Sequence, residues 1–260
     1  HCNGTFVVAW TTFEFDGLGD VVIQRFNASG IPLGPAMSVN SPASSSHALA
    51  DIAIDEDGNF VVVTSGENDL GDRGIFARVF SPTGATLVRQ FLVADDPTGL
   101  ITNPSVAMAD DGTFAVVWSN ADADTIDARI YNIDGAPQGG LINVSSTGGQ
   151  FPRIAMENDG AFVVTWAGVA PGDTTGILAR RFDASGVAQG DAFRVNTTTI
   201  DSQTAPDVGM GDDGRFIIAW SSFSSTSSWD VLAQRFLPDG TPDGVEFVAN
   251  TTTADIQNDV

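Results

Sequence analysis

The sequence predicts an all-β protein, a β-propeller of five blades with four antiparallel strands each. Three observations lead to this prediction. A motif recurs five times, each copy contains four short apolar stretches separated by turn residues, and the acidic residues are 28 Asp against 5 Glu. Four strands in a repeat of about 50 residues match the size of a propeller blade. Because Asp favours turns and Glu favours helices, the skew argues against a helical protein.

A glycine, followed after one residue by phenylalanine and a β-branched run, marks each repeat. Successive marker glycines are 54, 54, 48 and 54 residues apart. The marker glycines are Gly4, Gly58, Gly112, Gly160 and Gly214. We expect all five repeats to form a single domain over residues 1–260.

The first and second strands of a repeat flank this glycine. An apolar triplet such as 52–54 precedes an Asp-Gly turn in four repeats, and in the other repeat Asn3-Gly4 takes the place of Asp-Gly. Glycine supplies the positive φ that a tight hairpin requires. The second strand starts at phenylalanine and ends at tryptophan, as in 216–220, except that Thr64 replaces tryptophan in one repeat. Buried packing is the favoured interpretation of these tryptophans, with a sugar-stacking platform as the alternative.

The third and fourth strands complete the repeat. The third strand alternates apolar with small residues, as in 231–236, and a type I turn ending in glycine follows it. A short apolar strand such as 193–195 comes last. The fifth copy of the first strand begins near Ile256, and the sequence stops at Val260 within it. We expect this segment to complete the repeat of Gly4, so that the propeller closes by pairing its N- and C-terminal strands.

The motifs G-x-F-V-V-x-W, A-x-R-F-x-x-x-G and F-x-V-N-T-T-T run through the chain. This pattern resembles tandem β-propeller-type repeats of large secreted and surface proteins of bacteria, often in chains that also carry calcium-binding repeats. The resemblance covers the whole sequence and implies an extracellular or cell-surface location. It implies no particular activity.

Charge and composition limit the partners. The formal net charge of −22 comes from 33 acidic and 11 basic residues, which excludes a nucleic-acid partner. No apolar run has the length of a membrane-spanning helix, so we expect no membrane insertion. Cys2 is the single cysteine, so it is either a free thiol or half of an intermolecular disulfide.

The residue types argue against catalysis. His1 and His47 are the only histidines, and no nucleophile elbow, P-loop, zinc spacing or dinucleotide motif is present. Paired carboxylates for glycoside hydrolysis stay open, although the acidic residues lie at repeated turn positions. We therefore expect no enzyme, but an extracellular structural or adhesive module.

Two alternatives remain: a lectin-like carbohydrate-binding propeller, and a subunit of an extracellular filament joined by strand exchange. Self-association would use Ile256, Val260 and Cys2. The loops between second and third strands vary among the repeats, which favours them as a binding face for a protein or a surface glycan. Aromatic candidates in these loops are Trp229, Phe13, Phe15 and Phe223.

The same loops contain carboxylates two to four residues apart, beside glycine or other small residues. Such oxygens could converge on calcium, which takes six to eight oxygen ligands; solvated turn residues are the alternative interpretation. The candidate ligands are Asp16, Asp20, Asp69, Asp72, Asp122 and Asp124. Five Asn-x-Ser/Thr sequons are candidate glycosylation sites, at Asn3, Asn27, Asn143, Asn196 and Asn250.

Overall fold

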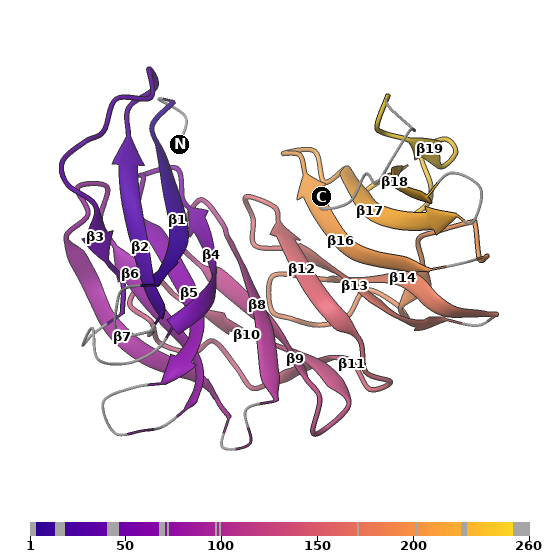
Figure 1. The fold of residues 1–260 in the computed structure, drawn as a ribbon, viewed down its shortest axis with the longest axis horizontal. Helices are drawn as coiled ribbons and strands as arrows, with labels where there is room; N and C mark the ends of the chain where they lie inside the picture. Colours follow the sequence, from indigo (N-terminus) through magenta and orange to yellow (C-terminus); the bar gives the residue numbers. More distant parts are fainter. Residues whose placement is uncertain are drawn as a thin grey trace. The chain divides into compact units, whose positions relative to one another are not determined.

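The computed structural model describes residues 4–13, 19–40, 47–67, 71, 73–96, 98, 100–170, 172–200, 202–224 and 228–251. Every helix-or-strand element in these ranges is a β-strand, as Figure 1 shows, so the all-β prediction is confirmed. Within the same ranges no helix has the length and apolar character needed to cross a membrane.

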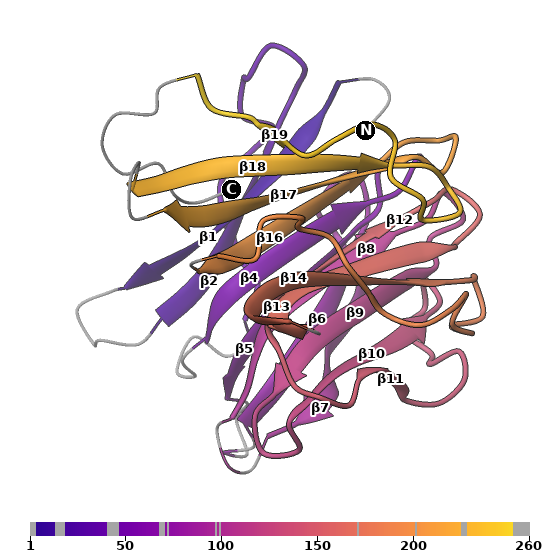
Figure 2. The same cartoon turned by 90° about the vertical axis from the view of Figure 1, so that its right-hand side faces the viewer.

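The strands form five antiparallel sheets, one for each repeat, as Figures 1 and 2 show. The first sheet contains β1 (Phe6–Phe13), β2 (Gly19–Phe26) and β3 (Met37–Ser38). The second contains β4 (His47–Ile54), β5 (Phe60–Glu67), β6 (Arg73–Phe80) and β7 (Thr86–Asp95). The third contains β8 (Ile101–Met108), β9 (Phe114–Asn120), β10 (Thr125–Tyr131) and β11 (Ile142–Ser145). The fourth contains β12 (Gln150–Met156), β13 (Phe162–Ala170), β14 (Asp173–Phe182) and β15 (Phe193–Arg194). The fifth contains β16 (Gln203–Met210), β17 (Phe216–Ser224), β18 (Ser228–Phe236) and β19 (Phe247–Val248).

Five sheets of antiparallel strands in chain order confirm the predicted blades of a β-propeller. The first sheet has three strands in the described part of the chain, where four are expected. Its expected additional strand, 256–260, lies outside the described residues. Closure by the N- and C-terminal strands therefore stays a prediction.

A pair of stacked aromatic rings joins the second and third strands of every sheet. The ring centroids are 4.9 to 5.3 Å apart, which is a favourable stacking distance. The pairs are Phe6–Phe26, Phe60–Phe80, Phe114–Tyr131, Phe162–Phe182 and Phe216–Phe236. The phenylalanines of two separate sequence motifs thus meet in one cross-strand contact.

Glycine closes the tight turn between first and second strands, as predicted. Gly58 has a φ of 84°, and its N–H donates to the Asp55 carbonyl over 3.1 Å. The marker glycines of the other repeats also have positive φ, between 73° and 91°. A side chain would be strained in this conformation, which explains why glycine recurs there.

The chain divides into two compact units. Unit 1 comprises His1–Trp118 with Arg129–Gly140, and unit 2 comprises Ser119–Ala128 with Leu141–Val260. The expectation of a single domain over 1–260 stays a prediction.

In each unit the core lies between consecutive sheets. In unit 2, Phe216, Ile218 and Trp220 of β17 pack against a cluster from the fourth sheet that includes Val163 and Ile177. In unit 1, residues of β9 pack in the same way against the second sheet. Burial of apolar surface between sheets is therefore the main stabilising contribution in both units.

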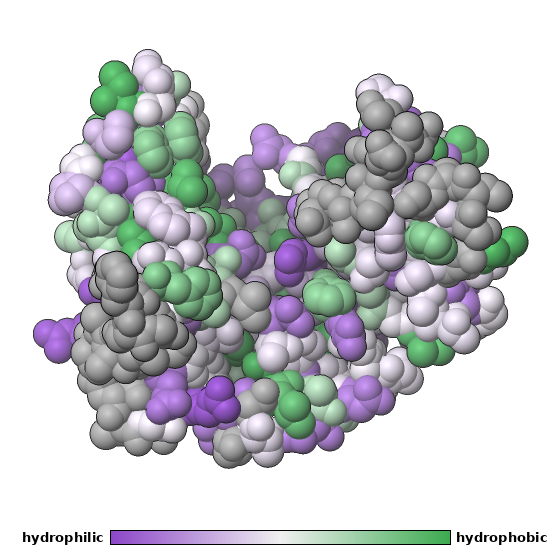
Figure 3. Space-filling model, in the orientation of Figure 1, coloured by the Kyte–Doolittle hydropathy of each residue, from purple (hydrophilic) through white to green (hydrophobic). Residues whose placement is uncertain are grey.

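The corresponding stripe of the first sheet is partly exposed. Phe6, Val8 and Trp10 of β1 are 40 to 42% exposed, and Figure 3 shows apolar side chains over this strand. By contrast, Trp118, Trp166 and Trp220 are at most 2% exposed, as the packing interpretation predicts. The tryptophan column is thus buried in the third, fourth and fifth sheets, and Trp10 of the first sheet is the exception.

Candidate functional site

The connections between second and third strands are short. In the fourth sheet, β13 reaches Ala170 and β14 begins at Asp173, so two residues separate the strands. Cross-strand pairing extends the hairpin because antiparallel strands can continue to a short turn regardless of side-chain variation. The variable residues therefore lie largely on strand ends.

A small polar pocket lies at such a strand end in unit 1. Its volume is about 210 Å³. Glu67 at the end of β5 and Arg73 at the start of β6 face each other across the hairpin and both line the pocket. Asp96, just after β7, also lines it. The fold thus brings two carboxylates and a guanidinium to one concave site, although they are far apart in the sequence.

Asp96 is fixed at the wall of this pocket. Its side chain is 5% exposed, and its Oδ1 accepts hydrogen bonds from the Leu100 amide at 2.8 Å and the Thr98 hydroxyl at 3.3 Å. Its own amide donates to the Arg73 carbonyl over 2.8 Å. Glu67, in contrast, is exposed at the strand end. One carboxylate is held in direction and the other is accessible.

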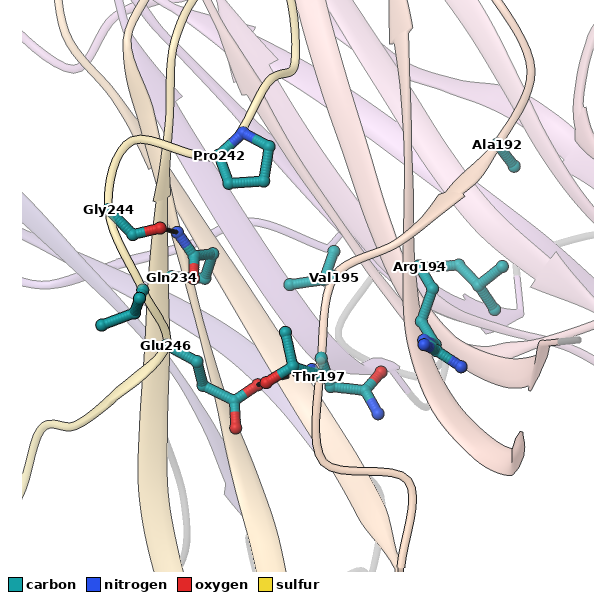
Figure 4. Close-up of a pocket in the computed structure, with 11 residues that line it drawn as sticks. Ala192, Arg194, Val195, Thr197, Gln234, Pro242, Gly244 and Glu246 are labelled. Carbon is teal, nitrogen blue, oxygen red and sulfur yellow. Dashed lines mark hydrogen bonds between the residues drawn. The ribbon is translucent and has the colours of Figure 1, made fainter. Parts of the chain in front are cut away.

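A larger groove of about 710 Å³ lies in unit 2 between the outer strands of the fourth and fifth sheets (Figure 4). Glu246 forms part of its wall. The Glu246 carboxylate accepts hydrogen bonds from the Thr197 amide at 2.6 Å and from the Thr197 and Thr198 hydroxyls at 3.0 Å each. These bonds hold a negative charge at the groove surface.

His47 has a structural environment. It is 1% exposed, with Nδ1 2.9 Å from the Thr64 hydroxyl and Nε2 2.9 Å from the Glu67 carbonyl. Burial lowers its pKa from the usual 6.5. In unit 2, Gln203 holds the corresponding place and accepts a hydrogen bond from the Trp220 indole at 3.2 Å. His47 with Thr64 therefore replaces a Gln–Trp pair.

The predicted aromatic residues are partly brought together. Phe223 and Trp229 face each other across the hairpin of the fifth sheet, with ring centroids 5.4 Å apart. Phe13 is 72% exposed at the end of β1, in unit 1. Phe15 lies outside the described residues. Only the Phe223–Trp229 pair is thus a contact among the candidates that the structure describes.

The structure describes three of the calcium candidates, Asp20, Asp122 and Asp124. Asp16, Asp69 and Asp72 lie outside the described residues. Asp20 accepts a hydrogen bond from Asn40 Nδ2 at 2.6 Å, and Asp122 and Asp124 lie in the turn between β9 and β10. Among the described residues no group of three His, Cys, Asp or Glu side chains could hold a metal ion.

Some sequon asparagines have structural roles that the sequence did not reveal. Asn196 is 1% exposed; its Oδ1 accepts the Ile177 amide at 2.8 Å, and its Nδ2 donates to Asp173 at 2.7 Å. Asn250 makes the same two contacts with Val231 and Asp230. These side chains fasten the end of the fourth strand to the start of the third, so Asn196 is inaccessible to a glycan.

The other sequons differ. Asn27 Oδ1 accepts the amides of Ser29 and Ile31 within a turn. Asn143 Nδ2 donates to Asp127 at 3.2 Å. Asn3 and the candidate self-association residues Cys2, Ile256 and Val260 lie outside the described residues.

Much of the Asp excess is turn chemistry. Asp183 Oδ1 accepts hydrogen bonds from the Ser185 hydroxyl and amide and from the Val187 amide. The Ser185 hydroxyl and these amides lower the pKa of Asp183. Asp239 follows the same pattern with Thr241 in the fifth sheet. That Glu67 and Asp96 line one pocket was missed, because no local signal in the sequence joins residues that meet only through strand pairing.

No protein-family model and no curated protein sequence matches the chain. Solved structures do match. An α-L-arabinofuranosidase of glycoside hydrolase family 43 from Clostridium thermocellum is 13% identical, with 98% of this chain and 93% of that chain covered and a TM-score of 0.51. A family 43 endo-arabinanase from Bacillus licheniformis is 14% identical, with 92% and 93% covered and a TM-score of 0.50. A protein of unknown function from Dyadobacter fermentans is 12% identical, with 96% and 80% covered and a TM-score of 0.65.

At this level of identity the matches establish the fold, the β-propeller. They also overturn the prediction of a non-enzymatic structural or adhesive module, together with its lectin-like and filament alternatives, because glycoside hydrolases have this fold over almost the whole chain. The argument against an enzyme was wrong because it relied on scarce histidine and interpreted the acidic residues as turn residues, whereas glycoside hydrolysis uses carboxylates and needs no histidine.

Proposed function

We propose that this chain is a carbohydrate-processing propeller that hydrolyses glycosidic bonds of an extracellular polysaccharide. The observation that carries the proposal is the pocket of unit 1, whose lining includes Glu67, Asp96 and Arg73. The arabinan-degrading enzymes among the structural matches support the substrate class. An extracellular location follows from a polymeric substrate that a cell would degrade outside.

Hydrolysis of a glycosidic bond needs one carboxyl group that protonates the leaving oxygen and one carboxylate that activates water or attacks the sugar. We assign the proton donor to Glu67, which is exposed at the pocket mouth. We assign the second role to Asp96, whose direction is fixed by the Leu100 amide. Arg73 then binds a sugar hydroxyl and orients the substrate.

The test is release of reducing sugar from arabinan and xylan by the purified chain. Glu67→Gln and Asp96→Asn each lower the rate by about 100-fold or more, because each removes one of the two acid–base groups. Glu56→Gln is the matched control, since Glu56 is an exposed glutamate in the turn before β5 of the same sheet. Unchanged rates in Glu67→Gln and Asp96→Asn would contradict the assignment of this pocket, and no release from either polysaccharide would contradict the substrate class.

Self-association through Cys2, Ile256 and Val260 stays a prediction. So does calcium binding, with the candidate ligands Asp16, Asp20, Asp69, Asp72, Asp122 and Asp124.

A further inference from the structure

The side chain at one position of the third strand forms a hydrogen bond to the preceding sheet in two of the repeats. This position lies two residues before the aromatic residue that closes the strand. The residue there is arginine in the second, third and fourth sheets and glutamine in the first and fifth. The five residues are Gln24, Arg78, Arg129, Arg180 and Gln234.

Arg180 shows what an arginine does at this position in unit 2. Its Nη1 donates to the Val144 carbonyl of the preceding sheet at 3.1 Å, and its Nε donates to the Gly190 carbonyl of its own sheet at 3.1 Å. The guanidinium also lies 5.6 Å from the centre of the Phe182 ring. The side chain therefore fills the space between two outer strands.

Arg78 makes two of the same contacts in unit 1, although in its own sheet its Nη2 donates to the Thr86 hydroxyl at 2.7 Å. Its Nη1 donates to the Val39 carbonyl of the preceding sheet at 2.7 Å, and its guanidinium lies 5.1 Å from the Phe80 ring centre. Val39 and Val144 hold the same position at the end of the fourth strand. Two independent copies of the repeat thus define one binding geometry for a guanidinium: a strand-end carbonyl and an aromatic face.

The fifth sheet has the acceptors without the arginine. Gln234 Nε2 donates to the Gly244 carbonyl at 3.4 Å and to the Arg235 carbonyl at 2.7 Å. Gly244 corresponds to Gly190, so glutamine satisfies the acceptor of its own sheet. In the described part of the chain, no hydrogen bond joins Gln234 to Val195, which corresponds to Val144. The space that Arg180 fills elsewhere is here the groove of about 710 Å³ in Figure 4, lined by Val195, Gln234 and Gly244.

We propose that this groove binds the guanidinium of an arginine side chain from a partner polypeptide, which makes the carbonyl contact that Arg78 and Arg180 make within the chain. Val195 supplies the carbonyl; Phe236 is 2% exposed and does not line the groove, so the ring contact of the internal arginines is not part of the proposed site. Glu246 supplies a negative charge that Arg180 does not need. Its Oε1 accepts one hydrogen bond in the described part of the chain, from Thr198, so a second lone pair remains for a guanidinium N–H.

Charge also favours a cationic occupant. The net charge of −22 attracts cations over a distance. Arg194 lines the groove as well and opposes a cation, but Figure 4 shows it across the groove from Glu246, with Thr197 between them. The site therefore selects the planar, bidentate guanidinium over a compact ammonium.

The test is titration of the full chain with N-acetyl-arginine methylamide, followed by calorimetry and by the NMR signals of the groove residues. We expect saturable binding that is about tenfold weaker in Gln234→Arg, because the new side chain occupies the groove. Glu246→Gln weakens binding severalfold by removing the charge, and N-acetyl-lysine methylamide binds several times more weakly than the arginine probe.

Gln24→Arg is the matched control, because Gln24 holds the same position in the first sheet and also donates to a carbonyl of its own sheet, that of Gly34. Binding by Gln24→Arg equals that of the unmodified chain. Absence of saturable binding at about 20 mM probe, equal affinity in Gln234→Arg and the unmodified chain, or equal affinity for the lysine probe would each overturn the proposal.

Discussion

The second strands of the first and fifth repeats, β1 and β17, have the same residue pattern and very different surroundings. In unit 2, Phe216, Ile218 and Trp220 are 0 to 3% exposed, whereas in unit 1 the first sheet leaves Phe6, Val8 and Trp10 about 40% exposed. Within each strand the alternation is the same. What differs is the sheet that precedes: the fourth sheet covers β17, and no described sheet precedes β1 in the chain. Burial of this stripe is therefore a property of the neighbouring sheet.

A second difference concerns the end of the same strand. In unit 2, the Trp220 indole meets Gln203, whereas in unit 1 Thr64 meets His47. Both pairs join residues 17 positions apart on paired strands. Only the pair in unit 1 contains a group that can titrate near neutral pH.

The largest expected effect comes from truncating the buried stripe. Trp220→Ala lowers the free energy of unfolding by about 3 to 5 kcal/mol, because it leaves a cavity in a packed core. Trp10→Ala costs less than about 2 kcal/mol, since part of its ring is already exposed. Urea denaturation followed by circular dichroism measures both. Equal losses would mean that Trp10 is covered in solution.

An intermediate effect is expected from Arg180→Gln, which gives the fourth sheet the residue type that the fifth sheet has at this position, Gln234. Arg180→Gln removes the hydrogen bond to Val144 of the preceding sheet and costs about 1 to 3 kcal/mol, the usual range for a charged donor. Arg215→Gln is the control: Arg215 pairs with Asp213 and Asp243 at 3.3 and 3.2 Å on the surface, and its loss costs less than about 1 kcal/mol. Urea denaturation measures the free energy of unfolding of both variants. A smaller loss for Arg180→Gln than for Arg215→Gln would show that the hydrogen bond between the sheets contributes little.

The smallest effect is a pH dependence that belongs to unit 1. Burial holds the pKa of His47 below the usual 6.5, so the unfolded chain takes up a proton at this residue before the folded chain does. The contribution of His47 to stability is complete above pH 6.5 and is lost as the pH falls below that value towards the lowered pKa. His47→Gln removes this contribution, so the melting temperature of the variant changes less between pH 5 and pH 7.5 than that of the unmodified chain. An identical change in the variant would show that His47 does not titrate in this window.

Local patterns were sufficient for the strands, the turns and the fold class. Gly58 marks a turn because its positive φ is a property of a few adjacent residues, and the Phe–Val–Trp alternation defines a strand face in the same way. Local patterns did not predict the candidate site. Glu67 and Asp96 line one pocket because β5 pairs with β6 and β6 pairs with β7. Asn196 donates a hydrogen bond to Asp173 because, in the fourth sheet, the end of the fourth strand lies beside the start of the third. No spacing in the sequence expresses either arrangement.

The sequence by itself determined the five repeats, their four-strand pattern and the turn chemistry that accounts for much of the Asp excess, because these depend on backbone conformations within a few residues. The tertiary structure decided which copies of a repeated residue are buried, which arginines link sheets, and where the absence of an arginine at Gln234 leaves a groove. These outcomes depend on contacts between sheets, and identical motifs acquire different roles when their neighbours differ.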